Sequence, residues 1–403
     1  MRAGSDAWRV LTDRSFGTFF LGSSLSNVGT WFQNIAAGLL VYELTRSTLL
    51  VGAVNFAQFL GTVLLAPWAG AAADRFDRRR LLLVTQLAAA AVGAGLAGLT
   101  VADRVSPPVV VGAALLLGLA LAFMVPALLA LVPLLVDEAD LEVAVSLNSV
   151  TFNLARAIGP VLGALVVDRA GYGVAFGLNA ASFLVFALAL LVVRPRPQPP
   201  RATTRPRLRE SVALVRADRR WMALLVAVMA VSTSTDPVNT LAPELALDVF
   251  AGRELDVGLL VGAFGAGATL TAVLLSPWLR GRPHVLVVAM LVQGAGMLLA
   301  GIAPSLGLAM AGFAVSGAGF IAAITRATAR LQAEVPDAQL GRVMALWSLA
   351  FVGTRPVAAL LDGVVAELAG ARMAAVVLAL PVLLAAPYVH RRLNAAAEAA
   401  AAR

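Results

Sequence analysis

The chain has 403 residues, of which 60% are hydrophobic and only 13% are charged, with a formal net charge of +8. Roughly a quarter of the residues of an average soluble domain are charged, so this composition predicts an integral membrane protein. Cysteine is absent, which excludes disulfides, thiolate metal sites and palmitoylation.

Apolar stretches of about 20 residues or more follow one another along the chain, each long enough to cross a hydrocarbon core of about 30 Å as a helix. None alternates apolar and polar residues, which favours helices over a barrel. We predict an all-α membrane protein with twelve transmembrane helices, the first retained rather than cleaved as a signal peptide. The predicted spans are residues 16–43, 48–72, 81–102, 107–136, 143–167, 171–193, 221–247, 255–279, 284–303, 305–325, 342–366 and 372–390.

All basic residues are arginines, and their distribution predicts the orientation. Of the 31 arginines, 24 lie in the amino terminus, the carboxyl terminus and alternate loops, five lie in the opposite loops and two lie in spans. This bias predicts a multi-pass protein of the inner membrane with both termini in the cytoplasm. The basic charge also suits contact with anionic membrane lipids, so no nucleic-acid partner is expected.

Residues 194–220 contain nine arginines and five prolines, a composition typical of an extended cytoplasmic linker. They separate a predicted amino-terminal bundle, 1–193, from a carboxyl-terminal bundle, 221–403. A regulatory site in this linker is the alternative.

The two halves are related in sequence. A gapless shift of 199 residues aligns Arg156 with Arg355 and Gly171 with Gly370, together with seven further identities. The hexapeptide VLLAPW at 63–68 recurs as VLLSPW at 273–278. An even number of spans in each half predicts two pseudo-symmetric six-helix bundles, repeated about an axis along the membrane normal.

Two motifs point to helix contacts. The first is GAAADRFDRRR at 70–80, in which the Asp74 carboxylate follows a helix end and could bind the free N–H groups of another helix. Anchoring of topology alone is the alternative. The second motif runs from Gly159 through Pro160 to Gly163, where proline favours a kink and the glycines allow close helix packing.

Ionisable residues at membrane depth are costly and point to mechanism. Arg156 and Arg355 lie well inside their spans and could bind an anionic group or form structural pairs. Asp236 lies in a polar patch before Pro237, which makes it a candidate for proton exchange, with helix capping as the alternative. Asp362 is expected to have a solvated or paired structural role, and it could pair with Arg355, seven residues away.

Polar and aromatic side chains on the first two spans could line a cavity for a bulky amphipathic molecule, although helix packing is the alternative for each. They are Asn27, Trp31, Gln33, Asn55 and Gln58. No catalytic motif or nucleotide-binding loop is present. The two histidines lie at span ends, so neither a metal site nor a cofactor is expected.

The chain resembles the major facilitator superfamily over nearly its whole length. Its 70–80 motif is similar to the superfamily's signature between helices two and three, matched by Gly70, Asp74, Arg75, Arg78 and Arg79, with Asp77 in place of the usual second glycine. The resemblance implies a conformational latch at Asp74 that engages the start of helix eleven. Gly159, Pro160 and Gly163 are similar to the antiporter motif of the superfamily's exporters.

Four stretches resemble the transmembrane secretion effector branch, which includes enterobactin exporters and macrolide efflux pumps. They are GTWFQ at 29–33, VNFAQFLGTVLLAPWAG at 54–70, DRFDRR at 74–79 and LNSVTFNLARAIGPVLGALV at 147–166.

The resemblance implies a secondary transporter and no enzyme: a monomeric, proton-coupled exporter of a small organic compound such as a drug, siderophore or secondary metabolite. Import, movement of lysophospholipids across the bilayer, and a non-transporting receptor or scaffold are the alternatives.

Overall fold

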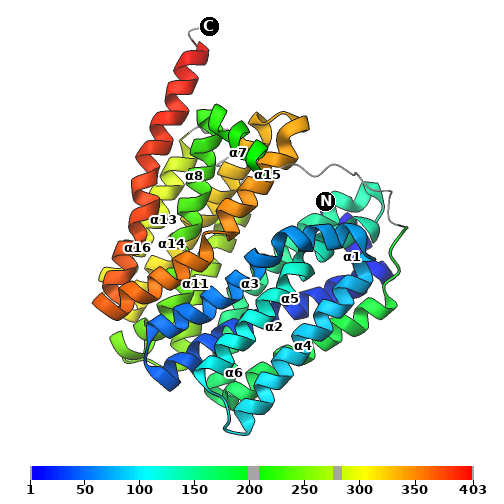
Figure 1. Cartoon of the computed structure of the whole chain (residues 1–403), viewed down its shortest axis with the longest axis vertical. Helices are drawn as coiled ribbons and strands as arrows, with labels where there is room; N and C mark the ends of the chain where they lie inside the picture. The colour runs from blue at the N-terminus through cyan, green and yellow to red at the C-terminus, as the bar shows by residue number, and fades with distance from the viewer. Residues whose placement is uncertain (1, 198–207, 276–283, 402–403) are drawn as a thin grey trace. The chain divides into compact units, whose positions relative to one another are not determined.

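The computed structural model describes residues 2–197, 208–275 and 284–401, within which a few side chains, including that of Asp74, are left out. Every regular element in this described part is helical (Figure 1). The all-α prediction is therefore confirmed.

The chain divides into two compact units, which are described separately. The first comprises Met1–Arg46, Ala53–Ala202 and Arg253–Gly258, and the second comprises Ser47–Gly52, Thr203–Gly252 and Leu259–Arg403. The helices before the linker are α1 (Arg2–Thr12), α2 (Arg14–Thr45), α3 (Thr48–Arg75), α4 (Arg78–Val101), α5 (Pro107–Leu131), η1 (Val132–Leu134), η2 (Glu138–Asp140) and α6 (Leu141–Val192).

The helices from Leu208 onward include several short pieces. They are α7 (Leu208–Ala217), α8 (Arg219–Thr233), α9 (Pro237–Thr240), α10 (Ala242–Glu244), η3 (Leu245–Val249), α11 (Glu254–Leu270), η4 (Thr271–Leu275), α13 (Val285–Ile302), α14 (Leu306–Glu334), α15 (Asp337–Val352) and α16 (Arg355–Ala401). Helix α7 lies inside the predicted linker, where we expected extended chain. Its sequence lacks proline, and Val215 on it is buried. Residues 198–207 of the linker lie outside the described residues.

Nine helical stretches of the described chain are long and apolar enough to cross a membrane. Two of them, Glu138–Val192 and Gln339–Asn394, contain a glycine with non-helical backbone that separates two helices. Gly171 has φ 81° and ψ 170°, and Gly370 has φ 81° and ψ 157°, a conformation that is essentially restricted to glycine. The helices follow the predicted spans in order, while the number twelve stays a prediction.

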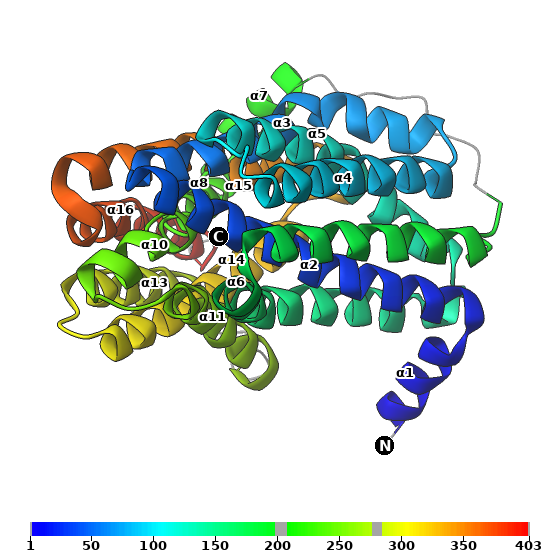
Figure 2. The same cartoon turned by 90° about the horizontal axis from the view of Figure 1, so that it is seen from below.

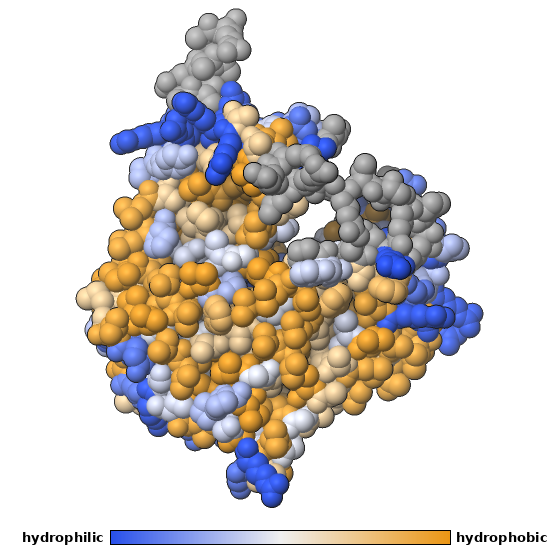
Figure 3. Space-filling view, viewed as in Figure 1, coloured by the Kyte–Doolittle hydropathy of each residue, from blue (hydrophilic) through white to orange (hydrophobic). Residues whose placement is uncertain are grey.

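Large apolar side chains remain exposed along these helices, including Leu21, Leu188 and Leu384. Figure 3 shows that apolar side chains dominate the visible face, with hydrophilic ones gathered toward its edges. A surface of this kind suits contact with lipid tails rather than water. The protein is thus a multi-pass membrane protein.

Within the first unit, α2 packs against α6, and α4 packs against α5 and α6 (Figure 2). The core contains Phe19 of α2 and Phe186 of α6, both fully buried, with ring centroids 5.6 Å apart in an edge-on arrangement. Within the second unit, α13 packs against α14 and α16, and α8 packs against α14, α15 and α16.

A matched pair of buried glutamines supports the internal repeat. In the first unit, Ser26 Oγ of α2 donates to Gln86 Oε1 of α4 at 3.4 Å. In the second unit, Gln293 Nε2 of α13 donates to the Val231 carbonyl of α8 at 2.9 Å and to Thr235 Oγ1 at 3.1 Å. In both units, therefore, a fully buried glutamine links its helix to a neighbouring helix: Gln86 of α4 to α2, and Gln293 of α13 to α8.

Candidate functional site

The span that begins the second bundle is interrupted at membrane depth. Helix α8 ends at Thr233, residues 234–236 form a turn, and Pro237 starts the short helix α9. Proline lacks the N–H that would continue the α8 hydrogen-bond ladder. Ser234, Thr235 and Asp236 in the turn are all buried, so the interruption brings polar side chains into the bundle interior.

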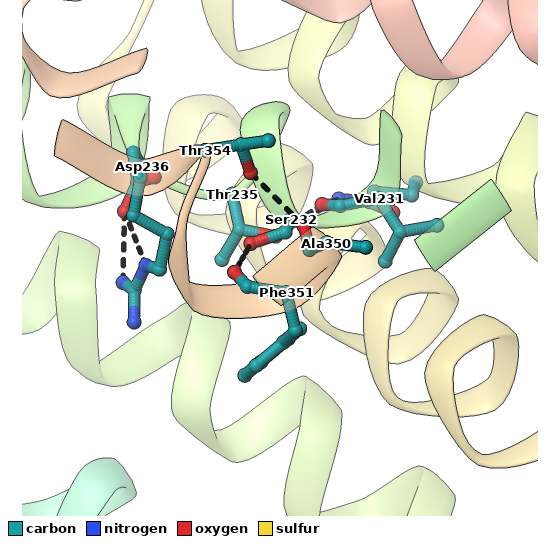
Figure 4. Close-up of polar contacts among 9 residues, drawn as sticks. Val231, Ser232, Thr235, Asp236, Ala350, Phe351 and Thr354 are labelled. Carbon is teal, nitrogen blue, oxygen red and sulfur yellow. Dashed lines mark hydrogen bonds and ion pairs between the residues drawn. The ribbon is translucent and has the colours of Figure 1, made fainter. Parts of the chain in front are cut away.

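A second interruption lies between α15 and α16. Helix α15 ends at Val352, and Gly353 and Thr354 form a turn before α16 begins at Arg355 and Pro356. Side chains satisfy carbonyl groups in the last turn of α15 (Figure 4): Ser232 Oγ donates to the Phe351 carbonyl, and Thr354 Oγ1 donates to the Ala350 carbonyl at 3.1 Å. Broken helices at membrane depth require such replacement partners.

The two breaks bring Asp236 and Arg355 together. Arg355 Nε lies 2.9 Å and Nη2 lies 2.8 Å from Asp236 Oδ1 (Figure 4). The Asp236 side chain is 1% exposed and that of Arg355 is 20% exposed, so the pair is largely removed from solvent. A buried ion pair is costly to break, because removing either partner leaves an uncompensated charge.

Asp362, which could pair with Arg355, makes no hydrogen bond to it in the described part of the chain. Arg355 makes its ion pair with Asp236, and neither Asp362 oxygen has a hydrogen-bond partner among the described residues. Asp362 is fully buried in α16, so it is not the solvated carboxylate that we expected either. The polar turn at 234–236, on a different span, provides an acceptor for Arg355.

A groove lies beside the break that precedes Arg355. It has a volume of about 470 Å³, and Met229, Thr233, Thr354, Val357 and Leu361 are among its lining residues. Most of these side chains are apolar, so the groove suits a hydrophobic group more than a charged one.

The counterpart arginine of the first bundle has a different environment. The Arg156 guanidinium lies 6.0 Å from the centre of the Trp31 ring, within the range of a cation–π interaction. Gly159 and Gly163 let α6 approach α2 closely: a Cβ atom would lie 2.6 Å from Trp31 Cβ at the first glycine and 2.9 Å from Phe32 Cα at the second. Pro160, next to the first of them, lies inside the continuous helix α6.

The basic motif at 70–80 joins three helices of the first bundle. Arg78 Nη1 donates to the Ala130 carbonyl near the end of α5 at 2.9 Å, and Arg79 Nη2 donates to the Leu191 carbonyl near the end of α6 at 2.7 Å. Helix ends have free carbonyls that arginine can satisfy. Asp77, which replaces the family's glycine, caps α4 by accepting from the Arg80 N–H at 2.7 Å.

The other residues of the 70–80 motif make fewer described contacts. The exposed Arg75 guanidinium lies 6.0 Å from the centre of the Phe76 ring, and a Cβ atom at Gly70 would meet nothing within 4 Å. The Asp74 side chain, on which the predicted latch depends, lies outside the described residues.

Two of the predicted cavity residues on the first two spans, Gln33 and Gln58, make hydrogen bonds to neighbouring side chains. Asn179 Nδ2 donates to Gln33 Oε1, and Gln58 Nε2 donates to Asn34 Oδ1 at 3.1 Å. The cavity beside these groups is only about 10 Å³, close to the space that one water needs. Asn27, Trp31 and Asn55 are partly buried.

Sequence reasoning missed the burial of Asp362 and the carbonyl contacts of Arg78 and Arg79. The alanines around Asp362 gave a weak signal of close helix packing, whereas nothing in the local sequence identified the carbonyls of distant helices. Among the described residues, no cluster of three or more histidine, cysteine, aspartate or glutamate side chains could hold a metal ion.

Helical membrane bundles with spans broken around buried ionisable groups are typical of secondary transporters, and this is the class of protein that the fold and site define. The model of a family described as transmembrane secretion effector matches residues 5–402. The chain belongs to this family, so it is a secondary transporter of an exporter family rather than an enzyme.

The individual relatives and solved structures agree with this class. The chain is 30% identical over 371 residues to the enterobactin exporter EntS of Salmonella typhi, covering 87% of this chain and 86% of that protein. It is 30% identical over 373 residues to EntS of Escherichia coli O1:K1 / APEC, covering 87% and 85%. A bacterial homolog of the human lysosomal transporter Spinster has a similar fold, with a TM-score of 0.73 at 13% identity over 94% of this chain and 96% of that chain. The nucleoside transporter NupG gives a TM-score of 0.73 at 14% identity, covering 94% and 98%.

Proposed function

We propose that the protein is a proton-coupled exporter of a small organic compound in the bacterial inner membrane, working by alternating access with both termini in the cytoplasm. The observation that carries this proposal is the buried Asp236–Arg355 pair at two broken spans. A buried charge pair that responds to the protonation of nearby carboxyl groups gives a transporter a way to link proton binding to a change of helix contacts.

The relatives and the second unit support a proposal for the substrate class. The two EntS relatives are named as exporters of enterobactin. The apolar groove beside Thr354 and the aromatic contacts of Trp347, Phe351 and Phe320 suit an amphipathic organic molecule with a ring system. We infer a siderophore, a secondary metabolite or a drug of this character as cargo, with a monomer in contact with membrane lipids as the working form.

The two sequence motifs take supporting roles in this proposal. Asp74 acts as a latch that favours one arrangement of the bundles, while Gly159, Pro160 and Gly163 keep α6 close to its neighbours. Substitution Asp74→Ala should reduce export while leaving membrane insertion intact. Normal export by that variant would remove the latch role.

Accumulation assays test the function directly. Cells that lack their own efflux pumps would express the wild-type chain or Asp236→Asn and be loaded with a panel of fluorescent dyes and a catecholate siderophore. The wild type should lower accumulation of at least one compound, and an uncoupler should abolish that effect. Export that survives the uncoupler, or that is unchanged in Asp236→Asn, would contradict proton coupling through this pair. Increased uptake would indicate an importer instead.

A further inference from the structure

Two buried carboxyl groups of the second bundle differ sharply in the hydrogen bonds that their oxygens accept. Asp236 Oδ1 receives two N–H groups of Arg355, at 2.9 and 2.8 Å. Asp362 is just as buried, at 0% exposure, yet neither of its oxygens has a hydrogen-bond partner among the described residues. The described surroundings of Asp362 therefore lack the donors that an ionised carboxylate needs.

Among the described residues, two charged groups act on Asp362. They are Asp236 and Arg355. Helix α16, which carries Asp362, packs against α8, α9 and α13, and next to Asp362 its Gly363 also packs against the uncharged start of α3 at Leu49. Neither α9 nor α13 contains a charged residue, and the charged residues of α8 are Arg219 and Arg220 in its first turn. Helix α10 brings Glu244, which accepts a hydrogen bond from the Ala371 N–H of α16 at 2.9 Å.

The charges of Asp236, Arg355 and Asp362, taken together, determine whether Asp362 is protonated. Arg355 provides one positive charge, and Asp236 already offsets it. A second ionised carboxylate would give the cluster a net negative charge in a setting that excludes water, which is costly without hydrogen-bond donors or a cation. The neutral acid avoids this cost, and two carboxyl groups near one another favour sharing a proton.

We infer that Asp362 is the binding site of the transported proton and that Arg355 is exchanged between Asp236 and Asp362 as this proton binds and leaves. The inference rests on the proposed proton-coupled transport and moves the proton from Asp236, the candidate that the sequence favours, to Asp362. The proton passes from hydronium to one Asp362 oxygen, which breaks an O–H bond of hydronium and forms one on the carboxyl group, and it returns to water by the reverse step.

The position of Arg355 gives the exchange a mechanical consequence. Arg355 is the first residue of α16, directly after the turn at Gly353 and Thr354. Asp362 lies seven residues further along the same helix, which is about two helical turns or ~10 Å. When Asp362 loses its proton, its negative charge competes for the guanidinium, the contact with Asp236 weakens, and the link between the two broken spans is released.

Infrared spectroscopy of the full-length protein in lipid nanodiscs tests the site without a substrate. The C=O stretch of a buried protonated carboxyl group should be present in the wild type at neutral pH and should be lost in Asp362→Asn. In Asp362→Glu the band should move rather than disappear, which keeps the test decisive if the asparagine variant folds poorly. The matched control is Glu367→Gln, which removes an exposed carboxylate five residues further along α16, and its spectrum should keep the band.

Two results would overturn the inference: a wild type that shows no such band, or a band that remains unchanged in both Asp362 variants. Transport measured in parallel distinguishes a failure of the proposed function. If the wild type shows a band that depends on Asp362 while its export does not respond to an imposed pH gradient, that result would support the protonated site at Asp362 and refute proton-driven export.

Discussion

Two segments of the chain that match at an offset of 199 residues, 141–171 and 340–370, share a backbone feature but use their central arginine differently. Both end on a glycine with φ 81°, at Gly171 and Gly370. In the first, α6 is continuous up to that glycine and Arg156 lies over the Trp31 ring. In the second, the helix is interrupted just before Arg355, which pairs with Asp236. The two repeated segments thus share the glycine turn, whereas the contacts of their central arginine differ.

The position of proline accounts for part of this divergence. Pro160 lies four residues after Arg156 within an intact helix, whereas Pro356 directly follows Arg355 and comes after Gly353 and Thr354. Glycine and proline together weaken the helix at one point, because one lowers helix propensity and the other removes a donor. The charge of the second bundle therefore lies at a break between helices, and that of the first lies within a continuous helix.

The largest expected difference is in stability. Arg355→Gln should lower the free energy of unfolding by about 3–5 kcal/mol, because it leaves Asp236 buried without its charge partner. Arg156→Gln should cost less than Arg355→Gln, since it loses a cation–π contact with Trp31 that is worth about 0.5–2 kcal/mol. Thermal unfolding of the purified variants in the same detergent measures both losses.

A double variant controls for the loss of the Arg355 side chain itself. Asp236→Asn/Arg355→Gln should be more stable than Arg355→Gln alone, because it no longer buries an unpaired carboxylate. Equal losses in Arg156→Gln and Arg355→Gln would contradict the difference between the two bundles.

The next largest expected loss of stability comes from disturbing the close packing of α6 against α2 in the first bundle. Gly159→Ala and Gly163→Ala should each destabilise the protein by about 1–3 kcal/mol, because the added methyl groups would overlap α2. Gly177→Ala, further along α6, is the matched control, since a Cβ atom there meets nothing within 4 Å. Unfolding temperatures that are the same for all three variants would show that the motif glycines do not hold α6 against α2.

Substitution of the glycine in the turn that both halves share should lower stability by a similar amount in each half. Gly171→Ala and Gly370→Ala force alanine into a backbone region that is essentially restricted to glycine, at a cost of about 1–3 kcal/mol each. Neither added methyl group would meet another atom within 4 Å, so unfolding of these variants measures backbone strain alone. Losses that differ clearly between the two sites would argue against their equivalence.

The smallest effect concerns Asp77. Asp77→Ala should lower stability by about 0.5–2 kcal/mol, because the α4 cap is lost, while Asp77→Gly should cost only a few tenths of a kcal/mol. Chemical unfolding monitored by helical circular dichroism compares the two. An alanine variant as stable as the wild type would show that the Asp77 cap contributes nothing.

The sequence predicted structural features correctly where a residue type has one dominant structural effect. The glycines at 171 and 370 and the arginines at 156 and 355 identified the repeat, and proline beside Asp236 indicated a broken span. The surroundings of Asp362 could not be predicted, because spacing along α16 shows which residues share a face but not which neighbour supplies a partner. The contacts of Arg78 and Arg79 join residues at least 52 positions apart, and no local pattern encodes such pairs.

The dependence of export on a pH gradient tests the central claim most directly. Proteoliposomes containing the wild type, Arg156→Gln or Asp362→Asn would be loaded with a compound that the accumulation assay identifies, and export would be compared with and without an imposed gradient. The gradient should accelerate export by the wild type and by Arg156→Gln, and it should have no effect on Asp362→Asn. Acceleration that persists in Asp362→Asn, or that is lost only in Arg156→Gln, would contradict the assignment of proton coupling to the second bundle.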